Sequence, residues 1–292
     1  MNQSSNQTAP RAIDFRAWEH ERTLADKAIC ALLSARFALI EPVRLRLARL
    51  LHEREYRDPS EESLISVVMT TFKRPKVLTE RCLPAIQRQT YRNFEVVITG
   101  DNRIDETSEL VRKLNDPRIR YFHVPEWTHY SKEIKSRWYV AGIPSRNRAM
   151  ALARGKWIAE IDDDDVFLPD HLESLLRFAQ KGNHEFVSGA YVVEKRGVKT
   201  VVDAKEVRPR IGGVQTWLYR SYLRFFKWNV ASWRKHYNRP PDIDRQLRMA
   251  RAGVRTGFLD KVVTHVLPIP GKETTGLDAL TEDRYDLSRP GS

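Results

Sequence analysis

The chain has 292 residues, 41% hydrophobic and 30% charged, which suits one large α/β domain with appendages. Its two cysteines, Cys30 and Cys82, have neither metal-ligand nor disulfide-framework spacing, which favours a reducing compartment. The first twenty residues are too polar for a signal peptide, and no uncharged apolar run reaches the roughly 18 residues of a membrane span. We therefore expect a cytoplasmic protein, neither a disulfide-rich secreted scaffold nor an integral membrane protein.

The net charge of +12 is concentrated in one part of the chain. Residues 166–240 hold 14 lysines and arginines against six acidic residues, whereas residues 1–58 hold ten against eight. A basic segment indicates an anionic partner, which is a nucleic acid, a phosphate-bearing substrate or a membrane surface.

Residues 1–58 are expected to form an N-terminal helical extension. Apolar residues recur at helical spacing between Asp14 and Leu51, and Pro42 is expected to end one helix and open another. The second helix would carry on one face Val43, Leu47, Leu50 and Leu51, with Arg44, Arg46 and Arg49 beside them. Such a helix lies on an anionic membrane, or it packs as an arm on the domain or on a second subunit of a homodimer. The eight acids of the segment favour the arm.

From Leu64 onward, predicted strands and helices alternate. Buried strands are predicted at Ile65–Met69, Phe94–Gly100, Ile119–Val124 and Lys156–Ala159, with helices at Val77–Gln89, Glu106–Leu114 and Pro144–Arg154. This alternation predicts an α/β fold with a parallel sheet and helices on both faces. In such sheets, ligands bind beyond the carboxyl ends of the strands.

Four consecutive aspartates, Asp162 to Asp165, follow the last of these strands. Adjacent carboxylates repel one another unless a positive charge lies among them, and hard oxygen ligands favour Mg²⁺, Mn²⁺ or Ca²⁺ over zinc. A solvated acidic turn is the alternative interpretation. Thr70 and Asp101, at the ends of two other strands, favour a shared crevice instead.

Four segments between Ile65 and Lys195 resemble, in order, the motifs of the family-2 glycosyltransferases, which have the GT-A fold. They are the strand and loop Ile65–Phe72, the strand ending in Asp101-Asn102 with Asp105-Glu106-Thr107 after it, the helix that begins Ser145-Arg146-Asn147, and Asp162–Asp165 with Leu168-Pro169-Asp170. Each is weak alone, but all four at family spacing are a strong signal over about half the chain. The resemblance implies residues 64–195 as the nucleotide-sugar-binding half of a mixed, mostly parallel, Rossmann-like sheet.

The resemblance also implies site residues. Asp164 would hold Mn²⁺ or Mg²⁺, and Asp162 or Asp163 would reach the metal or the ribose. The remaining nucleotide contacts would come from Thr70, Phe72, Asp101 and Arg146. Ordinary loop capping and a surface ion pair remain the alternatives for Thr70 and Arg146. Two positions depart from the family: Gly100 stands where an acid is frequent, and Phe72 replaces a common Tyr.

Residues 196–280 are expected to form the acceptor-binding half, before a tail at 281–292. Between Arg208 and Arg239 the aromatic residues are Trp217, Tyr219, Tyr222, Phe225, Phe226, Trp228, Trp233 and Tyr237, interleaved with bases. These rings either stack on sugars or a membrane interface, or they form a hydrophobic core under a basic surface. Nucleic acid ranks below these partners because no nucleic-acid-binding motif accompanies the rings.

The segment from Pro241 to Gly253 resembles the family helix whose second position is the catalytic base. That position is Asp242, which would take a proton from the acceptor hydroxyl, with Asp244 as the fallback and helix capping as the alternative role. His265, in a predicted terminal strand, matches a histidine that reaches the metal or diphosphate, although a lone His is more often structural.

The sequence thus predicts an inverting, metal-dependent glycosyltransferase that moves one sugar from a nucleoside-diphosphate sugar, with a UDP-sugar as the first expectation. The acceptor would be a glycan or glycolipid of the cell envelope, which allows peripheral contact with the inner face of the membrane. The chain lacks the Gln-x-x-Arg-Trp segment of the family's processive polymerases. The alternatives are a nucleotidyltransferase of similar fold and a catalytically inactive binding module.

Overall fold

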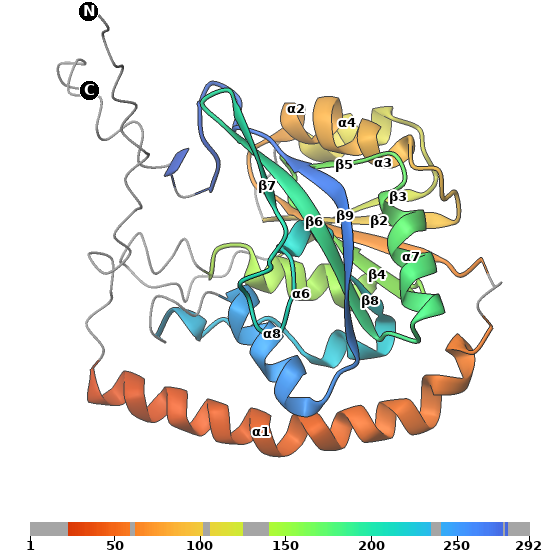
Figure 1. Cartoon of the computed structure of the whole chain (residues 1–292). Coiled ribbons are helices and arrows are strands. Elements are labelled where there is room, and N and C mark those ends of the chain that lie inside the picture. Colours follow the sequence, from red (N-terminus) through yellow and green to blue (C-terminus); the bar gives the residue numbers. More distant parts are fainter. Residues whose placement is uncertain are drawn as a thin grey trace, which may run out of the picture.

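The computed structural model describes residues 23–58, 62–101, 106–124, 140–234, 241–276 and 278–279. One central sheet carries helices on both faces, and helix α1 runs along the lower edge of the molecule (Figure 1). This arrangement confirms the expected α/β fold class with an N-terminal helix. No helix in the described part of the chain is both long enough and apolar enough to cross a membrane.

The described strands form a mixed sheet in the order β3-β2-β1-β4-β8-β6-β9-β5, with β7 paired to β6. Their bounds are β1 Ile65–Thr71, β2 Phe94–Asp101, β3 Ile119–Val124, β4 Trp157–Glu160, β5 Val166–Phe167, β6 Phe186–Lys195, β7 Val198–Val202, β8 Leu218–Arg220 and β9 Thr256–Val266. The run β3-β2-β1-β4 is parallel, as predicted. Beyond it, β8 pairs antiparallel with both β4 and β6. Strands β5 and β8 were not predicted, since two or three residues are too short to show a period of two.

The helices connect these strands. The α-helices are α1 Leu24–His52, α2 Pro75–Val77, α3 Leu83–Gln87, α4 Thr107–Lys113, α6 Ile143–Leu152, α7 His171–Lys181 and α8 Pro241–Ala252. The shorter helical segments are η2 Glu53–Tyr56, the π-helical η3 Leu78–Cys82, η4 Val214–Thr216, η5 Ser221–Phe225 and η6 Ser232–Arg234. Segments α2, η3 and α3 follow one another without a break, which agrees with the helix predicted near Val77–Gln89.

Alternate residues of β1 pack on opposite faces of the sheet, because successive strand side chains point to opposite sides. Val67 lies in a core with residues of η3, α3 and α7, whereas Val68 lies in a core with α6 and α8. Both side chains are fully buried. This double coverage explains why β1 reads in sequence as a continuous apolar run.

The expectation that Pro42 divides the N-terminal segment into two helices was wrong. Helix α1 is one continuous helix of 29 residues that includes Pro42, and Thr23 caps its N-terminus with a capping box. Tertiary contacts hold the helix on both sides of the proline. Before it, Glu41 pairs with Arg248 of α8, and after it Leu45 is buried in the core. Such packing outweighs the loss of one helical hydrogen bond.

The interpretation of the aromatic segment as a sugar-stacking surface is corrected for most of its rings. Five of them are buried and belong to the core that α6 and α8 share, namely Trp217, Tyr219, Tyr222, Phe226 and Trp228. Phe225 is half-buried, and the side chains of Trp233 and Tyr237 lie outside the described residues. The sheet itself continues across residue 196, through β6, β8 and β9. The division into 64–195 and 196–280 therefore stays a functional prediction.

Candidate functional site

The acidic loop follows β4 and lies against the carboxyl end of β1. Val68 of β1 is in register with Glu160 of β4, and the Ile161 N–H donates to the Val68 carbonyl at 3.3 Å. The Ile161 side chain is completely buried, which holds the start of the loop in place. The next residue of β1 to reach the loop is Thr71, whose hydroxyl donates to Asp163 at 2.7 Å.

The aspartates of the loop have different surroundings. The Asp162 side chain is 47% exposed and pairs with Arg146. Asp163 is buried against Thr71, and Asp164 accepts from Arg74 at 2.8 Å. Asp162 is therefore the loop carboxylate most open to solvent, while Asp163 forms part of the wall beneath it.

Three of the loop carboxylates, Asp163, Asp164 and Asp165, are held at raised pKa values. Burial, followed by the charge of Asp164, raises the pKa of Asp163 to about 6. Burial and the charge of Asp162 raise the pKa of Asp164, and the pKa of Asp165 lies well above its ordinary value for the same two reasons. The cations at hand, Arg74 and Arg146, thus do not balance the crowded carboxylates. Such a cluster favours binding of an additional cation.

The donor set suits a hard divalent cation. The part of the chain that the structure describes contains no ready group of three His, Cys, Asp or Glu ligands. Mg²⁺ in nucleotide sites is commonly held by one or two carboxylates, with water and substrate phosphates completing its six ligands. Asp162 and Asp164 fit that pattern. Arg74 now contacts both Asp163 and Asp164, and would share this place with a metal.

Arg146 connects the acidic loop to the rest of the crevice. It lies on α6, which starts after Gly142 in a left-handed conformation (φ 77°). Its guanidinium reaches Asp162, lies 3.7 Å from Glu160 and stacks 5.0 Å from the centre of the Trp228 ring. Although burial opposes the charge, Asp162 and Glu160 raise the pKa of Arg146 above its usual value. Arg146 is therefore a fixed cation at the base of the crevice.

A buried ion pair positions helix α8 against the same crevice. The Glu160 carboxylate, at the end of β4, pairs with Arg245 of α8 and accepts from the Tyr219 hydroxyl at 2.7 Å. Arg245 donates to the Phe226 carbonyl at 2.8 Å and lies over the rings of Tyr219 and Trp228. The buried aromatic residues thus hold the helix that carries Asp242.

Asp242 lies in the first turn of α8, within the electrostatic reach of the acidic loop. Burial raises its pKa, the charge of Arg146 lowers it, and the charge of Asp162 raises it. Its neighbour Asp244 is buried and pairs with Arg248 at 3.1 Å. Of these two acids, Asp242 is therefore the one whose pKa responds to the charges of Arg146 and Asp162.

The predicted nucleotide-binding residues are described in part. Thr70 is half-buried, and Phe72 is 49% exposed with the Lys73 ammonium 5.7 Å from its ring centre. Asp101 ends β2, but its side chain and residues 102–105 lie outside the described residues. At Gly100, a Cβ would lie 1.9 Å from the Tyr121 hydroxyl oxygen. The absence of an acid at this position thus has a steric reason.

His265 contacts an acid outside the loop. In the sheet, His265 of β9 is paired with Val166 of β5, which directly follows the loop. Its ring Nε2 is 3.2 Å from a carboxylate oxygen of Glu194. The structure thus brings together Asp162, Asp163, Asp164 and Arg146, leaves Asp242 within their electrostatic influence, and places His265 beside Glu194.

Sequence reasoning missed four residues of this crevice: Thr71, Arg74, Tyr191 and Gln215. Burial and then the charges of Asp165 and Asp242 raise the pKa of Tyr191, which shares a hydrogen bond with Gln215. Tyr191 is therefore within the electrostatic influence of both Asp165 and Asp242. No local signal marks it, because β6 reads as an ordinary apolar strand; Thr71 and Arg74 were recognisable only as neighbours of Thr70.

This geometry defines an α/β protein in which crowded carboxylates and a fixed arginine, suited to a cation and a phosphate-bearing ligand, lie at the end of β4. The model of glycosyl transferase family 2 matches residues 66–239, and the chain therefore belongs to that family. The chain is 30% identical over 135 residues to GalNAc(5)-diNAcBac-PP-undecaprenol beta-1,3-glucosyltransferase of Campylobacter jejuni. That match covers 46% of this chain and 40% of the relative. It is also 35% identical over 120 residues to the putative colanic acid biosynthesis glycosyl transferase WcaA of Escherichia coli, covering 40% and 38%.

Solved structures agree on the fold. S. aureus TarS 1-349 in complex with UDP-GlcNAc has a TM-score of 0.54 at 19% identity, covering 72% of this chain and 60% of that one. The mannosyltransferase PcManGT from Pyrobaculum calidifontis, in complex with GDP-Man and Mn2+, has a TM-score of 0.52 at 17% identity, covering 82% and 68%. These likenesses, together with the family match, confirm the GT-A fold of the chain.

Proposed function

We propose that this chain transfers one sugar from a nucleoside-diphosphate sugar to an acceptor hydroxyl, with inversion at the anomeric carbon. One observation carries the proposal: Asp242, from a late helix, shares an electrostatic environment with Asp162 and Arg146, from the nucleotide-binding half. A carboxylate beside a cation and an acidic loop is the arrangement that proton removal and diphosphate departure both need.

In the proposed reaction, Asp242 accepts the acceptor hydroxyl proton while the oxygen attacks the anomeric carbon. The carbon–oxygen bond to the diphosphate breaks as the new bond forms, and its electron pair leaves with the nucleoside diphosphate. Attack from the face opposite the leaving group inverts the configuration. Arg146 would stabilise the charge that develops on the leaving group. A bound Mg²⁺ or Mn²⁺, held by Asp162 and Asp164, would supply further neutralisation of the diphosphate.

The proposed acceptor is a lipid-linked glycan of the cell envelope. Two relatives bear names that specify such acceptors: the C. jejuni enzyme above and the E. coli UDP-Glc:alpha-D-GlcNAc-diphosphoundecaprenol beta-1,3-glucosyltransferase WfaP, 26% identical over 139 residues. The matched stretches span about half or less of these relatives, so the acceptor rests on analogy.

The test is a donor panel of UDP-, GDP- and dTDP-sugars, with Mn²⁺ or Mg²⁺ and a polyprenyl-diphosphate-linked sugar as acceptor. Release of nucleoside diphosphate should occur with one donor class and increase with acceptor. Asp164→Asn should remove the metal dependence and most of the activity, whereas Glu109→Gln, a change at an exposed acid of α4, should behave as wild type. A chain that binds a nucleotide sugar but never turns it over would instead be the inactive binding module.

A further inference from the structure

Helix α1 turns its acidic residues toward the protein and most of its leucines toward solvent. Its only two acidic residues, Asp26 and Glu41, are both buried and pair with Arg234 and Arg248. Arg49, expected beside the apolar face, is turned inward and forms two hydrogen bonds with Glu185, at 2.6 and 2.7 Å. An ordinary surface helix has the opposite arrangement.

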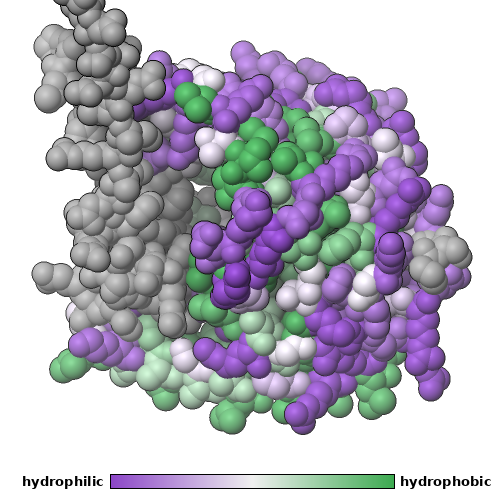
Figure 2. Space-filling view, viewed as in Figure 1, coloured by the Kyte–Doolittle hydropathy of each residue, from purple (hydrophilic) through white to green (hydrophobic). Residues whose placement is uncertain are grey.

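The outward face of α1 is the main exposed apolar surface of the described chain. Of the twelve large hydrophobic residues exposed there, eight lie on α1: Leu24, Leu32, Leu39, Ile40, Val43, Leu47, Leu50 and Leu51. From Leu32 onward they recur at helical spacing and form one stripe. Hydrophobic residues accordingly line the lower rim of the molecule (Figure 2). A continuous apolar surface of this kind marks a docking site.

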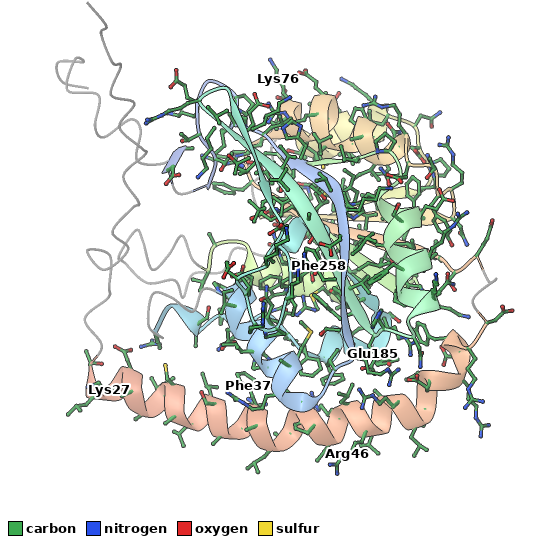
Figure 3. The ribbon with its side chains drawn as sticks, viewed as in Figure 1. Lys27, Phe37, Arg46, Lys76, Glu185 and Phe258 are labelled. Carbon is green, nitrogen blue, oxygen red and sulfur yellow. The ribbon has the colours of Figure 1, made fainter. Side chains whose placement is uncertain are left out.

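The charges that share this outward surface are basic. Arg36, Arg44 and Arg46 are exposed, while no acidic residue of α1 is. The labelled side chains show the division: Phe37 points toward α8, and Arg46 points away from the domain (Figure 3). Phe37 also lies under Arg248, 4.4 Å from the guanidinium carbon to the ring centre. The two acids of α1 itself, Asp26 and Glu41, therefore do not oppose membrane binding on this face.

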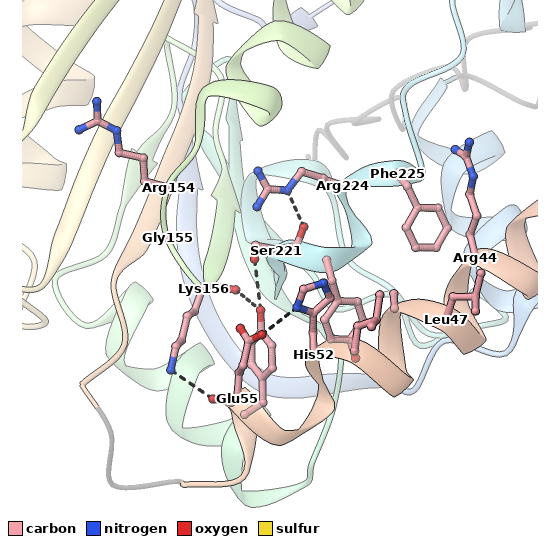
Figure 4. Close-up of a pocket in the computed structure, with 14 residues that line it drawn as sticks. Arg44, Leu47, His52, Glu55, Arg154, Gly155, Lys156, Ser221, Arg224 and Phe225 are labelled. Atoms are coloured by element: carbon pink, nitrogen blue, oxygen red, sulfur yellow. Dashed lines mark hydrogen bonds and ion pairs between the residues drawn. The ribbon is translucent and has the colours of Figure 1, made fainter.

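A hollow of about 570 Å³ opens beside the stripe, between the end of α1 and residues 154–156 and 221–225. Leu47 and Leu51 line it from α1, and Arg44 and Arg154 stand on its two sides (Figure 4). Arg224 and Lys156 add two more cations to the lining, and Glu55 adds one carboxylate, so the hollow stays basic. Apolar side chains next to a basic hollow match the acyl boundary and phosphate headgroup of an anionic lipid.

We propose that the outward face of α1 binds the surface of an anionic lipid bilayer, with the leucines at the acyl boundary and the basic hollow on lipid phosphates. A second copy of the chain fits less well, because two such basic faces would repel each other. The inward ion pairs hold α1 to α8, the helix of Asp242, so the bilayer would bind a part of the molecule rigidly joined to the crevice. This inference does not depend on the sugar or on the proposed chemistry.

The test is co-sedimentation of the full chain with vesicles of phosphatidylcholine alone or mixed with phosphatidylglycerol. Binding should require phosphatidylglycerol and weaken with added salt, because exposed charges are screened. The double variant Leu47→Asp, Leu50→Asp should lower the partition coefficient on the order of 100-fold, since each leucine loses its burial. Arg44→Gln with Arg46→Gln should lower it about 30-fold.

The matched control is Val198→Asp with Val201→Asp, which changes two exposed valines on β7, away from α1. This control should bind vesicles as wild type does. All variants should keep the wild-type melting temperature and, without vesicles, the wild-type rate of donor hydrolysis, which separates this proposal from the proposed reaction. Absence of vesicle binding, or equal loss in the β7 control, would overturn the proposal. So would a dimer in sedimentation velocity that Leu47→Asp, Leu50→Asp dissociates.

Discussion

The acidic loop and the buried ion pairs elsewhere in the domain use the same types of side chain in opposite ways. In the loop, carboxylates crowd together with too few cations, and the pKa values of Asp163, Asp164 and Asp165 are raised. In the buried ion pairs, by contrast, the carboxylates of Glu41, Glu160 and Glu185 each pair with an arginine. At Glu185, burial raises the pKa, but hydrogen bonds from Arg49, the Arg255 amide and Tyr222 lower it below the usual value overall.

This difference distinguishes carboxylates of the candidate site from carboxylates that stabilise the fold. Glu160 is only 1% exposed, yet Arg245 and Tyr219 satisfy its Oε1. Asp163 is also buried, but its neighbours on both sides are acids. Buried charges that are paired stabilise a fold only while both partners remain, whereas unbalanced charges mark a site that awaits a ligand.

The largest expected effect is on catalysis at Asp242. Asp242→Asn removes the proposed base, and kcat should fall roughly 10²- to 10⁴-fold with little change in nucleotide binding. Because burial raises the pKa of Asp242, the acidic limb of kcat/KM in the wild type should lie above the value of a free aspartate, about pH 4. A pH–rate profile and nucleotide titration measure both. A variant of undiminished kcat would assign the base elsewhere.

Breaking the buried pair should cost stability instead. Glu160→Gln leaves the guanidinium of Arg245 without its carboxylate, and the free energy of unfolding should fall by about 3–5 kcal/mol. Urea denaturation measures this loss. Glu109→Gln, at an exposed pair on α4, serves as the control and should unfold as wild type does. A stability equal to that of the control would mean that Glu160 does not support the fold.

In the loop, removal of an acid should have the opposite sign. With a folded pKa near 6 against an ordinary 3.8, the ionised Asp163 opposes folding by up to about 3 kcal/mol above pH 6. Asp163→Asn should therefore raise stability at pH 7.5. The advantage should vanish as the pH falls through 6 toward 3.8, because the wild-type carboxyl then takes up its proton. Thermal melts across this range decide it: a destabilised variant at pH 7.5 would make Asp163 a structural acid.

A smaller pH effect should come from His171, a buried group outside the crevice. Burial lowers its pKa to about 3, while the ring stacks on Phe167 and bonds the Val263 carbonyl. The unfolded chain takes up a proton near pH 6.5, so this contribution to stability is complete above 6.5 and declines as the pH falls toward 3. The loss should reach about 2–3 kcal/mol at pH 4.5. His171→Asn should flatten this part of the stability profile, and an unchanged slope would contradict the assignment.

Much of the fold could be predicted because the elements of its first half each show a recognisable pattern within a short stretch of sequence. The strand Ile119–Val124 was predicted at its observed bounds, and β1, β2 and β4 are mainly apolar runs that end in a polar turn. The acidic loop and Asp242 were likewise recognisable from consecutive residues. Strand β8 and the burial of Trp217 and Tyr219 were not, because a basic aromatic segment has the same composition whether it is a core or a surface.

The sequence by itself determined the fold class, the family and the residue types at the end of β4. Each of these depends on spacing along the chain, which local sterics and hydrophobic periodicity translate directly into structure. Only the tertiary structure decided which charges are balanced. Arg74 and Arg146 pair with carboxylates of the loop. Arg245 pairs with Glu160, and Arg248 pairs with Glu41. Since these partners are far apart in sequence, only the folded chain could show that α1 faces outward with leucines and arginines.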